Sequence, residues 1–99
     1  MDITATKDGG NSIITVPGNL DVMTSAAFKQ TLDEVILDST KIELDFTKTV
    51  LVSSAGLRVL LQSEKNVKKA EKNIVFKNVS PEVMEIFKIT GVDKIFTIE

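Results

Sequence analysis

The sequence switches between strand-type and helix-type patterns roughly every 10 to 15 residues, and this alternation limits the possible folds more than any other feature. Interleaved strands and helices predict an α/β fold, with a mixed β-sheet covered by helices mainly on one face. A chain of 99 residues is long enough for one hydrophobic core. No linker or internal repeat divides it, so we expect a single domain over residues 1–99.

The expected elements follow the order β β α β α β α β. Two segments joined by the turn-forming residues 7–11 predict a β-hairpin, and strict alternation predicts a third strand. Short apolar runs predict the remaining strands, and periodic apolar positions with capping residues predict three helices. The expected strands are 2–6, 12–16, 41–46, 74–76 and 95–98, and a strand-like run over 50–52 leads into the second helix. The expected helices are about 22–37, the stretch that follows Gly56 and runs to about Lys72 with Asn73 as the break, and the stretch from Pro81 to the stop at Gly91.

Aromatic residues are few, and each lies on a predicted apolar face. We therefore expect them to pack in the core and not to form a stacking surface for nucleic-acid bases. These residues are Phe28, Phe46, Phe76, Phe87 and Phe96.

The composition excludes several kinds of chemistry. The chain has no histidine and no cysteine, which removes Ser-His-Asp and Cys-His catalysis and the commonest transition-metal ligands. No general base accompanies Ser53 or Ser54 in the sequence, so we expect no enzymatic activity, no catalytic residues, no metal and no cofactor.

The charge distribution argues against direct nucleic-acid binding. The net charge is -2 and the isoelectric point is about 5.1, whereas nucleic-acid binding needs a broad basic surface. Four lysines, Lys65, Lys68, Lys69 and Lys72, do cluster near the end of the second helix and could form a nucleic-acid or lipid patch. The favoured interpretation is that they complement the helix dipole, with Glu64 and Lys68 as an i,i+4 pair.

No segment resembles a membrane anchor or a secretion signal. Residues 1–4 lack the basic and apolar regions of a signal peptide, and no apolar run approaches the roughly 20 residues of a membrane span. We expect a cytoplasmic protein without a membrane partner.

The segment Val52–Leu57 is the most informative part of the chain. Two serines and two small residues lie where an apolar run meets the start of a helix. One hypothesis is that Ser53 or Ser54 caps the helix and Gly56 permits close packing. The other is that the helix start carries a phosphate on a serine, which adds about −1.5 to −2 charges. Both can hold at once.

With that segment in view, the chain resembles the STAS domain family, the sulfate-transporter and anti-sigma-factor-antagonist domains. The resemblance covers nearly the whole chain and rests on four segments taken together. These are Val16–Asp21, Leu44–Phe46, Ser53–Leu61 and Thr90–Phe96.

The resemblance implies a single-domain STAS-like fold and a small anti-sigma factor antagonist. Its unphosphorylated form would bind an anti-sigma factor that is also a serine kinase, which frees a sigma factor. Phosphorylation would end this binding, and a serine phosphatase would reverse the mark. The family's acceptor serine falls on Ser54, with Ser53 as the alternative, because Ser53 occupies the position where members often have Asp.

Residues near that serine are the expected partner-binding surface. An alternative for Asp21 is that it caps the first helix. An alternative for Arg58 and Gln62 is that they are solvated surface residues. The expected set is Asn19, Asp21, Ser53, Ser54, Ala55, Gly56, Arg58 and Gln62.

A second function remains open from the sequence. The chain could be a STAS-type scaffold, or a subunit of a larger assembly that senses a small anionic metabolite at the same helix start.

Overall fold

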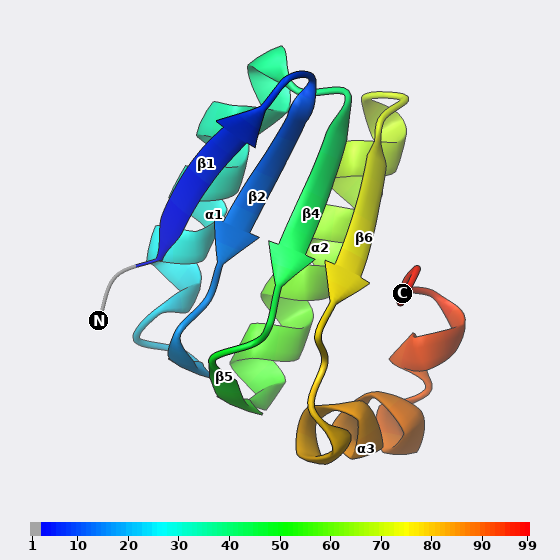
Figure 1. Ribbon diagram of the computed structural model, residues 1–99. Coiled ribbons are helices and arrows are strands. Elements are labelled where there is room, and N and C mark those ends of the chain that lie inside the picture. Colours follow the sequence, from blue (N-terminus) through cyan, green and yellow to red (C-terminus); the bar gives the residue numbers. More distant parts are fainter. Residues whose placement is uncertain (1–2) are drawn as a thin grey trace.

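A computed structural model describes residues 3–99, and Figure 1 shows its main sheet of four strands in the order β1-β2-β4-β6. β1 pairs antiparallel with β2, whereas β2, β4 and β6 are parallel. The expected mixed sheet is therefore confirmed. The four strands are β1 (Thr4–Asp8), β2 (Asn11–Thr15), β4 (Lys41–Asp45) and β6 (Asn73–Lys77).

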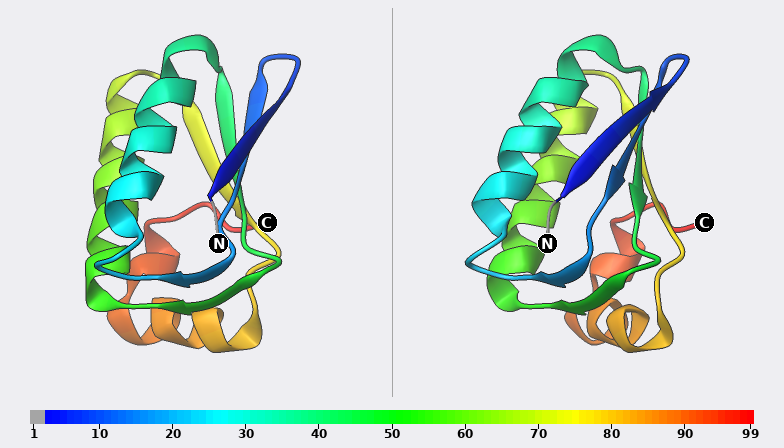
Figure 2. Two further views of the ribbon diagram at one scale, coloured as in Figure 1. Left: turned by 90° about the vertical axis from the view of Figure 1, so that its left-hand side faces the viewer. Right: turned by 60° about the vertical axis from the view of Figure 1, so that its left-hand side comes forward.

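The two longer helices lie against one face of this sheet, as Figure 2 shows in side view. The third helix lies across one end, where the carboxyl ends of the parallel strands point. The expectation that helices cover mainly one face is thus confirmed. The helices are α1 (Ser25–Val35), α2 (Ser54–Lys69) and α3 (Pro81–Thr90), with 3₁₀ turns η1 (Ile36–Asp38) and η2 (Val92–Lys94).

Alternation along β2 and β4 places the core on the helix side of the sheet. Ile14 and Val16 are fully buried, as are Ile42, Leu44 and Phe46. The intervening side chains of β4 are charged and partly exposed on the opposite face. This is the pattern of a sheet with one packed face and one solvated face.

The aromatic residues pack in the core, as the sequence predicted, and four of the five rings cluster near α3. Phe76 stacks on Phe96 with ring centroids 4.5 Å apart and meets Phe46 edge to face at 5.5 Å. Phe87 of α3 contacts Phe76 edge to face at 5.8 Å. Together with Phe28, all are at most 5% exposed, so none can serve as a stacking surface.

The strand expected over residues 95–98 is wrong. The 3₁₀ turn η2 occupies Val92–Lys94, and the last residues make one isolated parallel bridge between Ile98 and Phe76. The Phe76 backbone donates to the Thr97 carbonyl and accepts from the Glu99 N–H, which uses both polar groups of one residue only. Because Phe96 packs into the aromatic cluster, this single bridge does not extend into a strand.

Other element ends differ by a few residues. The first expected strand begins at Asp2, outside the described residues, and β1 extends to Asp8, into the expected turn. α2 ends at Lys69 rather than near Lys72, because Glu71 takes a left-handed φ of 61° that stops the helix. Asn73, the expected break, is the first residue of β6.

The third helix follows the sequence prediction closely. Ser80 accepts a hydrogen bond from the Val83 N–H, Pro81 is the first helical residue, and Gly91 ends the helix with a φ of 82°. Val83 and Phe87 are fully buried, and Met84 is half-buried.

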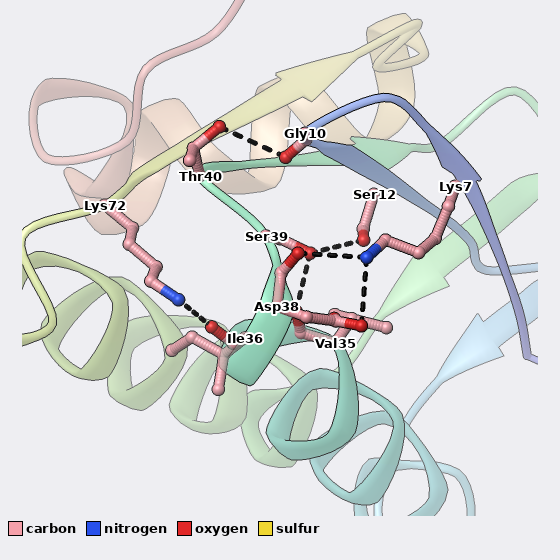
Figure 3. Close-up of polar contacts among 9 residues, drawn as sticks. All are labelled: Lys7, Gly10, Ser12, Val35, Ile36, Asp38, Ser39, Thr40 and Lys72. Atoms are coloured by element: carbon pink, nitrogen blue, oxygen red, sulfur yellow. Dashed lines mark hydrogen bonds and ion pairs between the residues drawn. The ribbon is translucent and has the colours of Figure 1, made fainter.

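Two lysines join separate elements at the end of the molecule opposite α3 (Figure 3). Lys7 of β1 donates to the Asp38 carbonyl and pairs with its carboxylate at 2.9 Å. Lys72 donates to the Ile36 carbonyl. Cations on the last carbonyls of a helix satisfy groups that lack intrahelical partners. Lys72 therefore has a structural role at the end of α1, which differs from the expected one of complementing the dipole of the second helix.

Candidate functional site at the start of α2

A small second sheet, which the sequence patterns did not predict as such, supports the start of α2. β3 (Gly18–Leu20) pairs in parallel with β5 (Thr49–Val52). The Gly18 N–H donates to the Lys48 carbonyl at 2.8 Å, and the Ser53 N–H donates to the Leu20 carbonyl at 3.0 Å. α3 packs against β5, so the strand that leads into α2 is held from two sides.

The turn between β4 and β5 is fixed by Asp45. Its Oδ1 accepts from the Thr47 N–H at 3.0 Å, from the Thr47 hydroxyl and from the Asn78 amide. The hydrogen bond from the Thr47 side chain is the main cause that lowers the pKa of the Asp45 carboxyl, so this turn is held by a carboxylate that stays ionised.

Ser53 is the N-cap of α2. Its Oγ accepts a hydrogen bond from the Gly56 N–H at 3.2 Å, and its carbonyl accepts from the Leu57 N–H at 2.8 Å. The capping hypothesis is confirmed for Ser53. The neighbouring Ser54 is the first helical residue and its side chain is exposed. Of the two serines, Ser53 is therefore the one that caps the helix.

Gly56 lets the helix approach β3. It is buried, and a β-carbon there would lie 2.2 Å from the Leu20 carbonyl oxygen, a distance that real atoms do not adopt. The expectation that Gly56 permits close packing is therefore confirmed. Its contact and the Ser53 cap fix the backbone on both sides of Ser54.

Asp21 caps a turn rather than the first helix. Its Oδ1 accepts from the Met23 N–H at 2.9 Å, and the Thr24 hydroxyl donates to the Asn19 carbonyl at 2.8 Å. α1 then begins at Ser25, later than the expected residue 22, because residues 22–24 form this turn. The helix-capping alternative for Asp21 is wrong, since Thr24 is the residue at the N-cap position.

This part of the surface exposes large apolar side chains that were not predicted as site residues. Val22 is 75% exposed, Met23 83%, Val50 67% and Leu51 44%. The spacing in the sequence could have indicated that Val22 and Met23 are exposed. Neither is three, four or seven positions from Phe28, which belongs to the apolar stripe of α1. Met23 and Val50 line a common hollow, and exposed apolar side chains that lie together mark interaction surfaces.

Two shallow hollows flank the 22–24 turn. Five of the eight expected partner-binding residues line them, whereas Ser53, Ser54 and Gly56 line neither. One, of about 400 Å³, includes Asn19, Asp21, Met23 and Val50 in its lining. The other, of about 360 Å³, lies between α1 and α2, and its lining is Val22, Ser25, Ala55, Arg58, Val59 and Gln62. Asn19, Arg58 and Gln62 are exposed, whereas Gly56 is buried beneath the surface. Gln62 also donates to Asn66 at 3.0 Å within α2.

The described residues offer few other sites. Within residues 3–99 there is no group of three or more potential metal ligands. The same range has no helix that is both long and apolar enough to cross a membrane.

A family model described as "Mlab, STAS domain" matches residues 3–98. The chain belongs to the STAS domain family. Over 102 residues it is 32% identical to BtrV of Bordetella bronchiseptica, a protein named as an anti-sigma factor antagonist, and the match covers 99% of this chain and 85% of BtrV. Anti-sigma factor antagonists with a STAS domain are regulators and not enzymes.

Solved STAS structures share the fold at low identity. An anti-sigma factor antagonist from Mycobacterium paratuberculosis superposes with a TM-score of 0.82 at 23% identity, over 97% of this chain and 82% of that one. The phosphorylated form of SpoIIAA from Bacillus superposes with a TM-score of 0.76 at 16% identity, over 98% and 90%. These likenesses establish the STAS fold for this chain.

Proposed function

We propose that this chain is an anti-sigma factor antagonist in a phosphorylation-controlled partner switch. Its unphosphorylated form binds an anti-sigma factor that is also a serine kinase, and this frees a sigma factor. The kinase transfers the γ-phosphoryl group of ATP to Ser54 Oγ, ADP and the hydroxyl proton leave, and binding ends. A serine phosphatase restores the binding form. The partners meet in the cytoplasm, and residues 1–99 act as one STAS-like domain.

The observation that supports this function most is the exposure of Ser54 beside apolar surface. Val22 and Met23 are largely exposed on the adjoining turn, and Leu51 lies on β5, two residues before Ser53. A neutral hydroxyl can be buried in an interface there at modest cost, whereas a phosphate dianion without a partner costs several kcal/mol. About 4 kcal/mol corresponds to a thousandfold loss of affinity.

Ser54 is a better acceptor than Ser53 on structural grounds. The Ser53 hydroxyl is half-buried and holds the Gly56 N–H, so its phosphorylation would alter the helix cap. The Ser54 side chain is exposed and makes no such contact. A kinase can reach the Ser54 hydroxyl without opening the fold.

Phosphopeptide mass spectrometry on protein recovered from its native cells tests the acceptor. Trypsin releases residues 49–58, whose only hydroxyls are Thr49, Ser53 and Ser54. We expect phosphate on Ser54. An unmodified peptide across several growth conditions would favour the scaffold or anion-sensor function instead.

Capture of the partner tests the switch itself. Tagged Ser54→Ala should retain an ATP-dependent serine kinase, and Ser54→Asp should lose it. Gln30→Glu, at an exposed position of α1, is the control for added negative charge and should behave like the wild type. Equal retention by the Ser54→Asp variant would refute the proposal.

A further inference from the structure

Arg58 lies one helical turn after Ser54 on the exposed side of α2. Ser54 is the first residue of the helix and Arg58 the fifth, and both side chains are exposed. Side chains four residues apart on a helix are neighbours, with β-carbons about 5–6 Å apart. An Arg side chain is longer than this separation, so its guanidinium can reach a group attached to Ser54 Oγ.

Among residues 3–99 the Arg58 guanidinium has no acidic partner. All five ion pairs within residues 3–99 are made by lysines. The helix neighbours of Arg58, three and four positions away, are uncharged: Ser54, Ala55, Leu61 and Gln62. Arg58 is therefore available to a new anion.

Arg58 is also the chain's only arginine and the only cation between residues 54 and 64. Its planar fork can donate two parallel hydrogen bonds to a phosphate, which a lysine ammonium cannot do. A phosphoserine carries three acceptor oxygens and most of two negative charges at neutral pH. The pair is matched in charge, geometry and position.

We propose that Arg58 binds the phosphate of phosphorylated Ser54 within the same chain. The proposal rests on phosphorylation of Ser54, which is part of the proposed function. In the unphosphorylated protein Arg58 lines the hollow between α1 and α2, where it is free to contact a partner. Phosphorylation then has two effects: it adds negative charge beside the apolar surface, and it withdraws the one guanidinium from that surface.

Phosphorus NMR tests the pair without any kinase or partner. Phosphoserine is incorporated at position 54 during translation, and the second phosphate pKa, about 6 when free, is measured in four chains. These are the otherwise unchanged chain, Arg58→Gln, Arg58→Lys and Lys65→Gln, the last removing an exposed lysine elsewhere on α2. An i,i+4 pair of this kind should lower the phosphate pKa by at least about 0.3 relative to Arg58→Gln.

The pattern over the four chains decides the outcome. We expect Lys65→Gln to match the unchanged chain and Arg58→Lys to be intermediate. Equal phosphate pKa values in the unchanged chain and in the Arg58→Gln variant, or an equal effect of Lys65→Gln, would overturn the proposal.

A second readout uses the fact that the chain has one arginine. Its Nε–H group gives a single NMR signal, which should shift and exchange more slowly with water when phosphoserine is present, and an unchanged signal would contradict the pairing. This readout needs no change at Arg58. If the pair forms but native protein carries no phosphate, the proposed function fails while the pairing stands.

Discussion

The α-carbon of Gly56 and the carbonyl oxygen of Leu20 are so close that a β-carbon on Gly56 would lie 2.2 Å from that oxygen. The same carbonyl accepts the hydrogen bond from the Ser53 N–H. One backbone group of β3 thus fixes both the cap of α2 and the first turn that follows it.

Gly56→Ala should therefore destabilise the protein and displace the start of α2. The clash is with backbone, which cannot rotate away, so we expect a loss of at least about 2 kcal/mol in the free energy of unfolding. Gly9→Ala is the control: its β-carbon would meet no atom within 4 Å, but its φ of 65° should cost about 1 kcal/mol. Urea unfolding measures both. A smaller loss for Gly56→Ala than for Gly9→Ala would show that α2 can shift at little cost.

The two serines should separate in stability measurements. Ser53→Ala removes the acceptor of the Gly56 N–H and should cost about 1 kcal/mol, whereas Ser54→Ala should change stability by less than about 0.5 kcal/mol. Ser53→Asp should stay near the wild type, because Asp is an equally good N-cap. Thermal unfolding of the three variants checks this. Equal losses of stability in the two alanine variants would show that Ser53 is not the residue that caps α2.

The N-cap position also explains how this chain departs from its family's pattern. Ser53 stands where members often have Asp, and both residue types accept a backbone N–H at a helix start. The substitution preserves the local structure around Ser54. It removes a negative charge beside Ser54, the acceptor under the proposed function.

Sequence patterns predicted the elements whose signals are local. The alternation in β4, the cap Ser80 and the stop at Gly91 depend on neighbouring residues, and the structure confirms them. β3 was missed because three residues are too few to show the alternation of a strand. It becomes a strand only through its pairing with β5. The prediction of a strand over 95–98 was wrong for a related reason. Residues of strand-forming type make a strand only where a neighbouring strand supplies hydrogen bonds, and here only one bridge forms.

The candidate site divides in the same way. Ser53, Ser54 and Gly56 could be predicted because one short segment holds all three. The exposure of Val22 and Met23 could not be predicted, because it depends on hydrogen bonds of Asp21 and Thr24 that delay the start of α1.

Away from the site, the burial of Glu64 was also missed, since its spacing to Lys68 is that of a surface pair.

Glu64 should make stability depend on pH. The residue is 4% exposed, its carboxylate oxygens have no hydrogen-bond partner, and the Lys68 ammonium is 3.7 Å away. Burial raises the pKa of Glu64 above its ordinary value of 4.5, and Lys68 opposes this only in part. A carboxyl whose pKa is higher in the folded state than in the unfolded state stabilises the fold when the pH is below the unfolded-state pKa. This contribution is lost as the pH rises through the folded-state pKa.

Glu64→Gln should remove that loss. At pH 7 we expect the variant to be more stable than the wild type by an amount on the order of 1 kcal/mol, with the difference shrinking toward pH 4. Urea unfolding between pH 4 and pH 7 measures it, and Glu71→Gln, at an exposed position, is the control. A pH-independent difference would mean that Glu64 is not the titrating group.

Met23 should contribute to partner affinity without contributing to stability. Its side chain is 83% exposed on the turn beside the Ser54 site, so the fold loses little when it is shortened. We expect Met23 to be one of the minority of interface residues whose truncation costs more than about 1 kcal/mol, so Met23→Ser should weaken kinase capture about tenfold. Leu37→Ser is a matched control, because Leu37 is 82% exposed on η1, at the end of α1 away from Ser54. Quantitative capture with both variants, alongside their unfolding temperatures, measures the effect. Equal losses of capture for Met23→Ser and Leu37→Ser would place the partner elsewhere on the molecule.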